Sequence, residues 1–316
     1  MKTRHFKQVD VFTAQPYFGN PLAVVLDGSG LDDAAMQRFA QWTHLSETTF
    51  VLPPTEASAD YQVRIFTPGG ELPFAGHPTL GTCHAWLEAG GVPKRKDLVV
   101  QQCQAGLVHI RSEGARRAFA APPVKRSAPS PAVLAQVAAA LGLKAQHIIA
   151  AQVLDNGPVW LGLLLDSADT VLQLEADHLA LKKYGLKVGV AGAHAAQTAP
   201  VLIARSSREA RAFAPSEHSA PADTVDFEVR AFAAPIGINE DPVTGSLNAS
   251  LAQWLMAEGH APDNYSVAQG TCLGRAGRVY LARESAAGAT QAASTGSGQV
   301  WVGGQSVTCI DGSVML

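Results

Sequence analysis

The 316-residue sequence has little charge and few cysteines. Charged residues make up 16% of it and the formal net charge is −3 at pH 7, so it lacks the basic surface that a nucleic-acid backbone requires. The four cysteines Cys83, Cys103, Cys272 and Cys309 show no C-x-x-C spacing, which argues against a zinc site and against a disulfide framework. We therefore expect no nucleic-acid partner, no metal, and reduced thiols.

Long hydrophobic runs are also missing. The first residues, MKTRHFKQVDVF, contain no apolar stretch of signal-peptide length. The most apolar region, residues 148–165, is interrupted by the polar and turn-forming sequence Asp155-Asn156-Gly157-Pro158. These absences predict a cytoplasmic protein with no membrane partner.

The chain does contain enough hydrophobic residues, 47%, for two cores, and its length favours two domains. Short β-rich runs predominate. Beside them the pattern predicts surface helices over residues 32–43, 132–141 and 176–184. A proline- and serine-rich stretch, APPVKRSAPSPA, indicates a boundary near residues 121–131. We expect an N-terminal domain over residues 1–122, with the C-terminal strand, about 303–316, added back to it, and a C-terminal domain over residues 130–302.

Two further helices, within residues 73–91 and 241–259, are almost uncharged and resemble each other. Aligning Trp86-Leu87 with Trp254-Leu255 superimposes HPTLGTCHAWLEAG on GSLNASLAQWLMAEG, which indicates an internal duplication. A helix with small and apolar residues on most faces is stable only when it is surrounded. We predict an α+β fold of two similar domains, each a β-roll or barrel wrapped around a central helix. The alternative is an ordinary amphipathic helix on one sheet.

The starts of these two helices are small and polar. Gly76-His77-Pro78 predicts one start, and Asp241-Pro242 reads as an N-cap followed by a first turn. Uncovered N–H groups beside Gly76 and Gly245 would suit an anion such as a carboxylate. Converging starts would present these donors to one ligand.

Simpler interpretations of the same residues remain open. Asp241 could serve merely as the N-cap of its helix, and Ser246 could accept hydrogen bonds from first-turn amides. His77 could be a hydrogen-bonded turn residue, and Glu47 a solvated loop carboxylate.

Five sequence blocks together resemble the phenazine-biosynthesis PhzF family, which has the diaminopimelate epimerase fold. The blocks run the length of the chain: GNPLAVVL, LSETTFV, IFTPGGELPFAGHPTLG, NEDPVTGSLNASLAQWL and QGTCLGRAGRVYL. The resemblance implies an active site in the cleft between the two domains, a homodimer, a small carboxylate-bearing metabolite as substrate, and isomerisation by proton transfer without a cofactor. It implies Glu47, His77 and Asp241 as catalytic residues. It further implies a substrate-binding set of Ser46, Gly76, Gly245 and Ser246.

The implied chemistry has physical requirements that the residues can meet. Glu47 could remove and return a carbon-bound proton if burial and Asp241 raised its pKa toward about 6 to 7. The related epimerases use a cysteine at each helix start, whereas this chain has Ala75 and Pro242 at the places we align with them. We interpret Cys83 as a core thiol, and Cys272 as a loop residue that could still reach the cleft.

Other functions on this fold remain open from the sequence, namely an epimerase, a lyase or a non-catalytic binding protein. Substrate specificity should come from the loops at residues 154–158 and 212–224.

Overall fold

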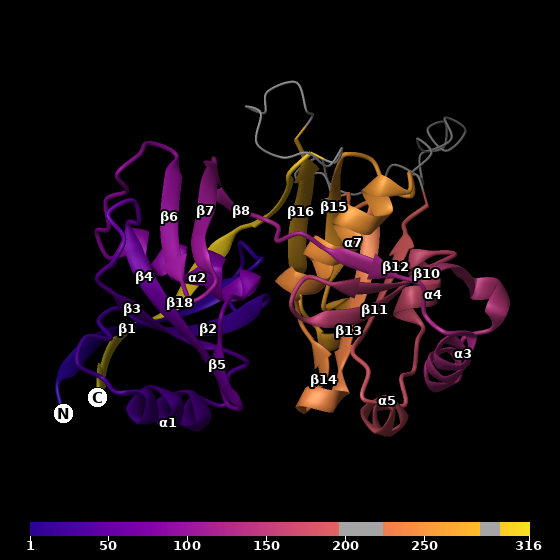
Figure 1. The fold of residues 1–316 in the computed structure, drawn as a ribbon, viewed down its shortest axis with the longest axis horizontal. Coiled ribbons are helices and arrows are strands. Elements are labelled where there is room, and N and C mark those ends of the chain that lie inside the picture. The colour runs from indigo at the N-terminus through magenta and orange to yellow at the C-terminus, as the bar shows by residue number, and fades with distance from the viewer. Residues whose placement is uncertain (196–223, 285–297) are drawn as a thin grey trace, which may run out of the picture.

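A computed structural model of the chain describes residues 1–195, 224–284 and 298–316. Figure 1 shows two halves side by side, with the N-terminal half drawn in indigo and magenta and the C-terminal half mainly in pink and orange. The yellow C-terminal strand crosses back to the first half, where both chain ends lie. The helices are α1 (Asp33–Thr43), α2 (Gly76–Glu88), α3 (Pro131–Ala140), α4 (Ala168–Leu172), α5 (His178–Tyr184), α7 (Gly245–Ala257), and the 3₁₀ turns η1 (Ala145–His147), η3 (Ala234–Ile236) and η4 (Thr271–Leu273).

The strands of the N-terminal half are β1 (Thr3–Val11), β2 (Asn20–Val25), β3 (Thr48–Leu52), β4 (Tyr61–Thr67), β5 (Gly70–Leu72), β6 (Leu98–Cys103), β7 (Gly106–Glu113), β8 (Arg116–Ala120) and the returning β18 (Ser306–Met315). Those of the C-terminal half are β9 (Lys125–Ser127), β10 (Ile148–Asp155), β11 (Val159–Leu165), β12 (Val188–Ala193), β13 (Phe227–Ala233), β14 (Ile238–Asp241), β15 (Asn264–Gln269), β16 (Gly277–Arg283) and β17 (Val300–Gly304).

The two halves have the same strand order. In the first, β1 pairs antiparallel with β2, β2 runs parallel to β3, β3 pairs antiparallel with β4, and β4 runs parallel to β6, which continues antiparallel into β7 and β8. In the second, β10, β11, β12, β13, β15, β16 and β17 repeat this sequence of antiparallel and parallel pairs. Each parallel pair is bridged by a crossover that contains a helix, as parallel strands require. The duplication predicted from the two helices therefore extends to the whole sheet.

The halves also exchange strands. After β8 the chain crosses over, and β9 pairs with β10 of the second half. After β17 it crosses back, and β18 pairs with β1 of the first half over nearly its full length. Direct pairing of β8 with β17 joins everything into one 18-stranded sheet. We propose that the domain boundary lies between Ala120 and Lys125, where the chain leaves β8 for the other half.

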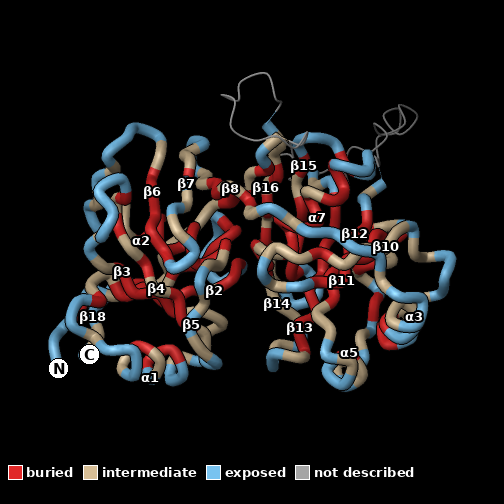
Figure 2. The backbone as a smooth tube through the Cα atoms, viewed as in Figure 1, coloured by how far each residue is buried: buried red, intermediate tan, exposed pale blue. Residues whose placement is uncertain are grey.

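The helices α2 and α7 are enclosed by strands of their own halves. Helix α2 buries every residue from Gly76 to Cys83, so no face of its first two turns is exposed. It contacts β1, β2, β3, β6, β8 and β18. Helix α7 buries all but a few of its residues, among them the fully enclosed Trp254. The wrapped helix predicted from composition is confirmed, and an amphipathic helix packed on one sheet is wrong. Figure 2 shows the same pattern, with buried backbone concentrated in strands and central helices.

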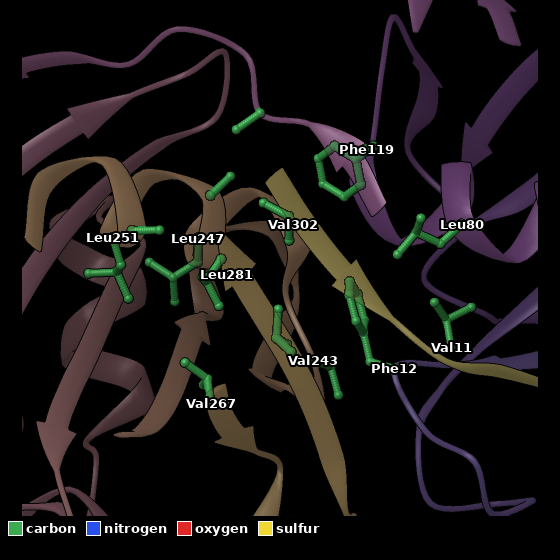
Figure 3. Packing of buried hydrophobic residues seen from close by; sticks show 14 of the residues in the cluster. Val11, Phe12, Leu80, Phe119, Val243, Leu247, Leu251, Val267, Leu281 and Val302 are labelled. Atoms are coloured by element: carbon green, nitrogen blue, oxygen red, sulfur yellow. The ribbon is translucent and has the colours of Figure 1, made fainter. Parts of the chain in front are cut away.

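The main hydrophobic cluster is continuous across the junction of the halves. Figure 3 shows Phe119 of the first half close to Val302 of the second, with Leu80 and Leu247 of the same cluster on either side. Smaller clusters lie outside the sheet, one under α1 and one under α3, α4 and α5. Within the described residues, no helix is long and apolar enough to cross a membrane.

The surface helices begin close to their predicted positions because their caps are local. Asp32 accepts a hydrogen bond from the Ala35 backbone nitrogen at 2.7 Å and starts α1. Helix α4 was not predicted, because its five residues are too few to show a helical period.

A methyl group added to α2 tests how tightly the helix is enclosed. A Cβ at Gly81 would lie 2.6 Å from Leu22 Cδ2 and 2.7 Å from Val11 Cγ2. Helix propensity favours alanine over glycine by about 1 kcal/mol, but overpacking costs about 1–3 kcal/mol. We expect Gly81→Ala to lower the free energy of unfolding by about 1 kcal/mol, measured by urea denaturation. Gly69→Ala, whose new Cβ would have its nearest neighbour at 3.6 Å, should change it by less than about 0.5 kcal/mol. A more stable Gly81→Ala protein would show that α2 is loosely held.

Candidate active site

The starts of α2 and α7 touch each other at the junction of the two halves. A Cβ at Gly245 would lie 3.1 Å from the backbone nitrogen of His77 and 3.2 Å from Gly76 Cα. Neither N-cap residue, Ala75 or Thr244, forms a side-chain cap hydrogen bond. The first N–H groups of a helix have no partner within it, and those of Gly76, His77, Gly245 and Ser246 find no acceptor among the described residues. Two partial positive charges are therefore concentrated at one place.

The start of α7 corrects one prediction. Asp241 is the last residue of β14, not an N-cap, and the helix begins only at Gly245. The backbone nitrogen of Thr244, which an N-cap Asp241 would be expected to bind, donates instead to the distant Gln269 Oε1 at 3.1 Å. By position relative to the helix, Thr244 and not Pro242 is the counterpart of Ala75. Neither helix start carries a cysteine in either alignment.

Glu47 and His77 form a pair beside these helix starts. Glu47 lies in the short segment between α1 and β3, and its Oε2 is 3.1 Å from His77 Nδ1. The Glu47 side chain is 19% exposed and that of His77 5%. The other ring nitrogen of His77, Nε2, is buried and has no hydrogen-bond partner among the described residues. Ser46 Oγ is likewise buried without a partner. Buried polar atoms without partners are uncommon in proteins, and these two are available to a ligand.

Asp241 faces the same place from the second half. Its Oδ1 accepts a hydrogen bond from Asn20 Nδ2 at 3.0 Å, and its Oδ2 accepts one from Thr244 Oγ1 at 2.6 Å. Burial and the negative charge of Glu47 raise the pKa of Asp241 to about 6, against the opposing effects of Thr244, His77 and Asn20. The site therefore contains a carboxyl group that titrates close to neutral pH.

The pKa expected for Glu47 was wrong in direction. Burial alone would raise it, but the hydrogen bond and the charge of His77, together with the neighbouring Ser46 hydroxyl, outweigh burial, and the pKa of Glu47 is lowered from its ordinary value. The raised pKa belongs instead to Asp241. Of the two neighbouring carboxyl groups, the one that His77 does not hydrogen-bond holds its proton more tightly.

Ser246 is already engaged within the protein. Its Oγ accepts a hydrogen bond from Trp160 Nε1 at 3.3 Å, and its carbonyl oxygen accepts one from Asn156 Nδ2 at 3.0 Å. Asn156 belongs to the loop 154–158 that the sequence pointed to for specificity, and its Oδ1 is buried with no hydrogen-bond partner in the described part of the chain. The second loop, residues 212–224, lies outside the described residues except for Thr224.

Two residues of the site were not singled out from the sequence. Asn20 comes from the N-terminal half and donates both to Asp241 and to the Val243 carbonyl oxygen, at 2.9 Å. Gln269 donates to the Asp241 carbonyl oxygen and to Thr244 Oγ1. Both side chains are almost fully buried. Each lies in a block that carries the family resemblance, GNPLAVVL and QGTCLGR, and a buried amide in such a block was the available signal.

Neither Cys83 nor Cys272 forms a hydrogen bond with Glu47, His77 or Asp241. Cys83 is buried in the core, and burial raises the pKa of its thiol to about 12. Cys272 lies in η4, exposed, with Sγ 3.5 Å from the Leu172 carbonyl oxygen at the end of α4. Within the described residues, no three histidine, cysteine or acidic side chains are grouped as metal ligands would be. Two surface hollows, of about 350 and 440 Å³, lie elsewhere, over β15–β17 and beside α1.

Known proteins resemble the chain over its full length. A 33% identical relative, "Antisense-enhancing sequence 1" of Schizosaccharomyces pombe, aligns over 100% of both chains. The trans-2,3-dihydro-3-hydroxyanthranilate isomerase of Pseudomonas aeruginosa is 32% identical over 88% of this chain and 90% of its own. A crystal structure of a Bacillus anthracis phenazine biosynthesis protein of the PhzF family superimposes with a TM-score of 0.78 over 100% of both chains, at 22% identity, and shows the shared fold. Residues 9–312 match the family described as phenazine biosynthesis-like protein, PhzC-PhzF, and the chain therefore belongs to that family.

Proposed function

We propose that this protein is an isomerase that moves a proton between two carbons of a small carboxylate-bearing metabolite, with Glu47 as the acid and base. The observation that carries the proposal is the Glu47–His77 pair, buried beside two uncapped helix starts and a second carboxyl group from the other half. The relatives whose names describe isomerases support the same reaction class.

The helix starts would hold the substrate's carboxylate. Free N–H groups at Gly76, His77, Gly245 and Ser246 are aligned with two helix dipoles, an arrangement that favours anions. His77 Nε2 and Ser46 Oγ, both without partners, would supply further hydrogen bonds. Because these groups are fixed by buried helices, they need no rearrangement when charge develops in the transition state.

Proton transfer would then follow from the state of Glu47. Its lowered pKa leaves it ionised at neutral pH and therefore able to accept a proton from carbon. A bound substrate carboxylate adds negative charge nearby and would raise the pKa of Glu47, which opposes the lowering of that pKa by His77. The Glu47 carboxyl group returns the proton to a second carbon. One C–H bond is broken and another formed while the double bond shifts, and the step uses neither a metal nor an organic cofactor.

A second candidate is an epimerase on the same scaffold. The raised pKa of Asp241, about 6, supports it, because a protonated acid opposite Glu47 could deliver a proton to the other face of one carbon. A lyase or a non-catalytic binding protein would retain the same anion site. The cytoplasmic location expected from the sequence stays a prediction.

Solvent deuterium uptake into a panel of carboxylate metabolites tests the role of Glu47. We expect Glu47→Gln to slow uptake by about 10²–10⁴-fold, because general acid–base catalysis contributes about that factor. Binding of the same metabolite, measured by calorimetry, should change much less because glutamine keeps the shape of the side chain. Label at a new carbon indicates isomerisation, whereas label at one inverted carbon indicates epimerisation.

The matched control for this experiment is Glu56→Gln, which removes an exposed carboxylate in the segment between β3 and β4. It should leave uptake unchanged. Equal uptake by the wild type and Glu47→Gln would remove Glu47 from the mechanism, and tight binding without uptake in the wild type would favour a binding protein.

The titration of Asp241 predicts a pH dependence of stability. Its pKa rises from 3.8 to about 6 on folding, so between these values the folded protein holds more protons than the unfolded chain. The contribution of Asp241 is then fully present below about pH 4 and is lost as the pH rises through about 6. Asp241→Asn cannot lose a proton. We therefore compare the free energy of unfolding of Asp241→Asn with that of the wild type at each pH. The variant minus wild-type difference should be larger at pH 7 than at pH 4 by about 2–3 kcal/mol, since one pKa unit corresponds to about 1.4 kcal/mol.

Urea denaturation at both pH values measures this difference, with Asp166→Asn, an exposed change, as the control. A difference between Asp241→Asn and wild type that is the same at pH 4 and pH 7 would contradict a raised pKa at Asp241.

A further inference from the structure

Gln269 is the centre of a buried hydrogen-bond network beside Asp241. It is the last residue of β15, and its side chain is fully buried. Its Oε1 accepts hydrogen bonds from the Thr244 backbone nitrogen at 3.1 Å and from Asn248 Nδ2 at 2.8 Å. Its Nε2 donates to the Asp241 carbonyl oxygen at 3.1 Å and to Thr244 Oγ1 at 3.0 Å. The two acceptor and two donor positions of this amide are therefore all used.

The backbone partners fix which end of the Gln269 amide donates. The Thr244 backbone N–H can only donate, so the atom that faces it is Oε1. The Asp241 carbonyl oxygen can only accept, so the atom that faces it is Nε2. Reversing the amide would break both bonds. Because Nε2 also faces the Thr244 hydroxyl, that hydroxyl accepts a hydrogen bond from Gln269.

The hydroxyl hydrogen of Thr244 is in turn directed at Asp241. Thr244 Oγ1 lies 2.6 Å from Asp241 Oδ2 and has no other acceptor among the residues that the structure describes. The second carboxyl oxygen, Oδ1, accepts a hydrogen bond from Asn20 Nδ2, and the Asn20 amide is oriented by its other bond, to the Val243 carbonyl oxygen. Both carboxyl oxygens of Asp241 therefore face a donor.

These two donors restrict where the acid proton of Asp241 can lie. The amide NH₂ group of Asn20 does not accept hydrogen bonds. The Thr244 hydroxyl would accept one from Asp241 only by turning its own hydrogen toward the Gln269 NH₂ group, which already donates to it. When Asp241 is protonated, its proton therefore occupies a lone pair that these groups leave free. The charged groups that act on Asp241 are Glu47 and His77.

The first half of the chain lacks this network. Cys103 takes the place of Gln269 there, because each pairs with the glycine that begins the next strand. The counterpart of Thr244 is Ala75, which has no hydroxyl group. Helix α2 is nevertheless enclosed by its strands, as α7 is. Enclosing a central helix thus does not need these side chains, and we relate them to Asp241 instead.

We propose that Gln269 is a positioning residue of the site. Through the Thr244 hydroxyl it keeps a donor on Asp241 Oδ2, so that the acid proton of Asp241 stays on a lone pair open to a bound ligand. The proposal rests on the proposed function in one respect, namely that Asp241 acts on the substrate. The network is a property of the free protein, so it is tested without a substrate, and its failure is distinguishable from failure of the proposed reaction.

Carbon-13 NMR of the full-length chain, labelled at the aspartate carboxyl carbons, measures the pKa of Asp241. Its signal is the one that Asp241→Asn removes. Thr244→Val deletes the donor to Oδ2 and should raise this pKa by about one unit, because a hydrogen bond to a carboxylate stabilises the charged form by about that much. Thr244→Ser keeps the hydroxyl group and should leave the pKa close to that of the wild type.

A double-mutant cycle tests the part played by Gln269. Gln269→Met removes the amide without adding charge. The Thr244 hydroxyl is then free to turn and accept the Asp241 proton, which stabilises the acid form and should raise the pKa of Asp241. In the Thr244→Val background, Gln269→Met should cause no further rise, because no hydroxyl is left to turn. If Gln269→Met does not fold, Gln269→Glu takes its place, and the cycle subtracts the effect of the added charge.

The matched control is Gln101→Met, which removes a fully buried glutamine amide of β6 that is bonded to Tyr61 and Thr79. It should leave the pKa of Asp241 unchanged. Circular dichroism and urea unfolding establish that each variant is folded. An unchanged pKa in Thr244→Val, or an equal rise in Thr244→Ser, would overturn the proposal. So would an equal effect of the Gln269 substitution with and without the Thr244 hydroxyl.

Discussion

The contact between the starts of α2 and α7 is the constraint on which the rest of the structure depends. Glycine leaves the room that each helix start needs, at Gly245 against α2 and at Gly76 against Phe119. At Gly245 any side chain would press on the backbone of His77, and at Gly76 a Cβ would lie 2.4 Å from Phe119 Cζ. A helix start has unsatisfied donors wherever it lies, but two starts reach this separation only if both helices are buried to their first residue. The burial of the two helices therefore brings their unsatisfied N–H groups together.

The exchange of strands fixes the relative position of the halves. Because β18 returns to β1 and β9 crosses to β10, neither half has a complete set of strands from its own continuous segment. The main hydrophobic cluster also runs through the junction. Asn20 adds a polar connection, donating from the first half to Asp241 and Val243 of the second. A site assembled from both halves thus does not depend on a hinge for its alignment.

The sequence predicted what rests on local patterns and missed what rests on distant partners. Small and apolar residues on most faces identified the central helices, and Gly76-His77-Pro78 located the start of α2. The sequence predicted that α7 begins at Pro242, but it begins at Gly245. The segment before it is bound at Thr244 by Gln269, which lies 25 residues further along the chain. The pKa of Glu47 was misjudged for the same reason, since its partner His77 lies on another element, 30 positions away. Asn20 and Gln269 lie in blocks that carry the family resemblance, but their role was missed because an amide side chain becomes informative only when its hydrogen-bond partner is known.

The duplication also explains why the two carboxyl groups differ. Both helix starts lack a side-chain cap, so both favour the charged form of a nearby carboxyl group. The difference comes from the side chains that have diverged around them: histidine follows Gly76, whereas serine follows Gly245. His77 holds Glu47 in its charged form, and that charge, together with burial, disfavours charge on Asp241. With a histidine at only one of the two helix starts, Glu47 is ionised at neutral pH, whereas Asp241 has a pKa of about 6 and titrates just below neutral pH.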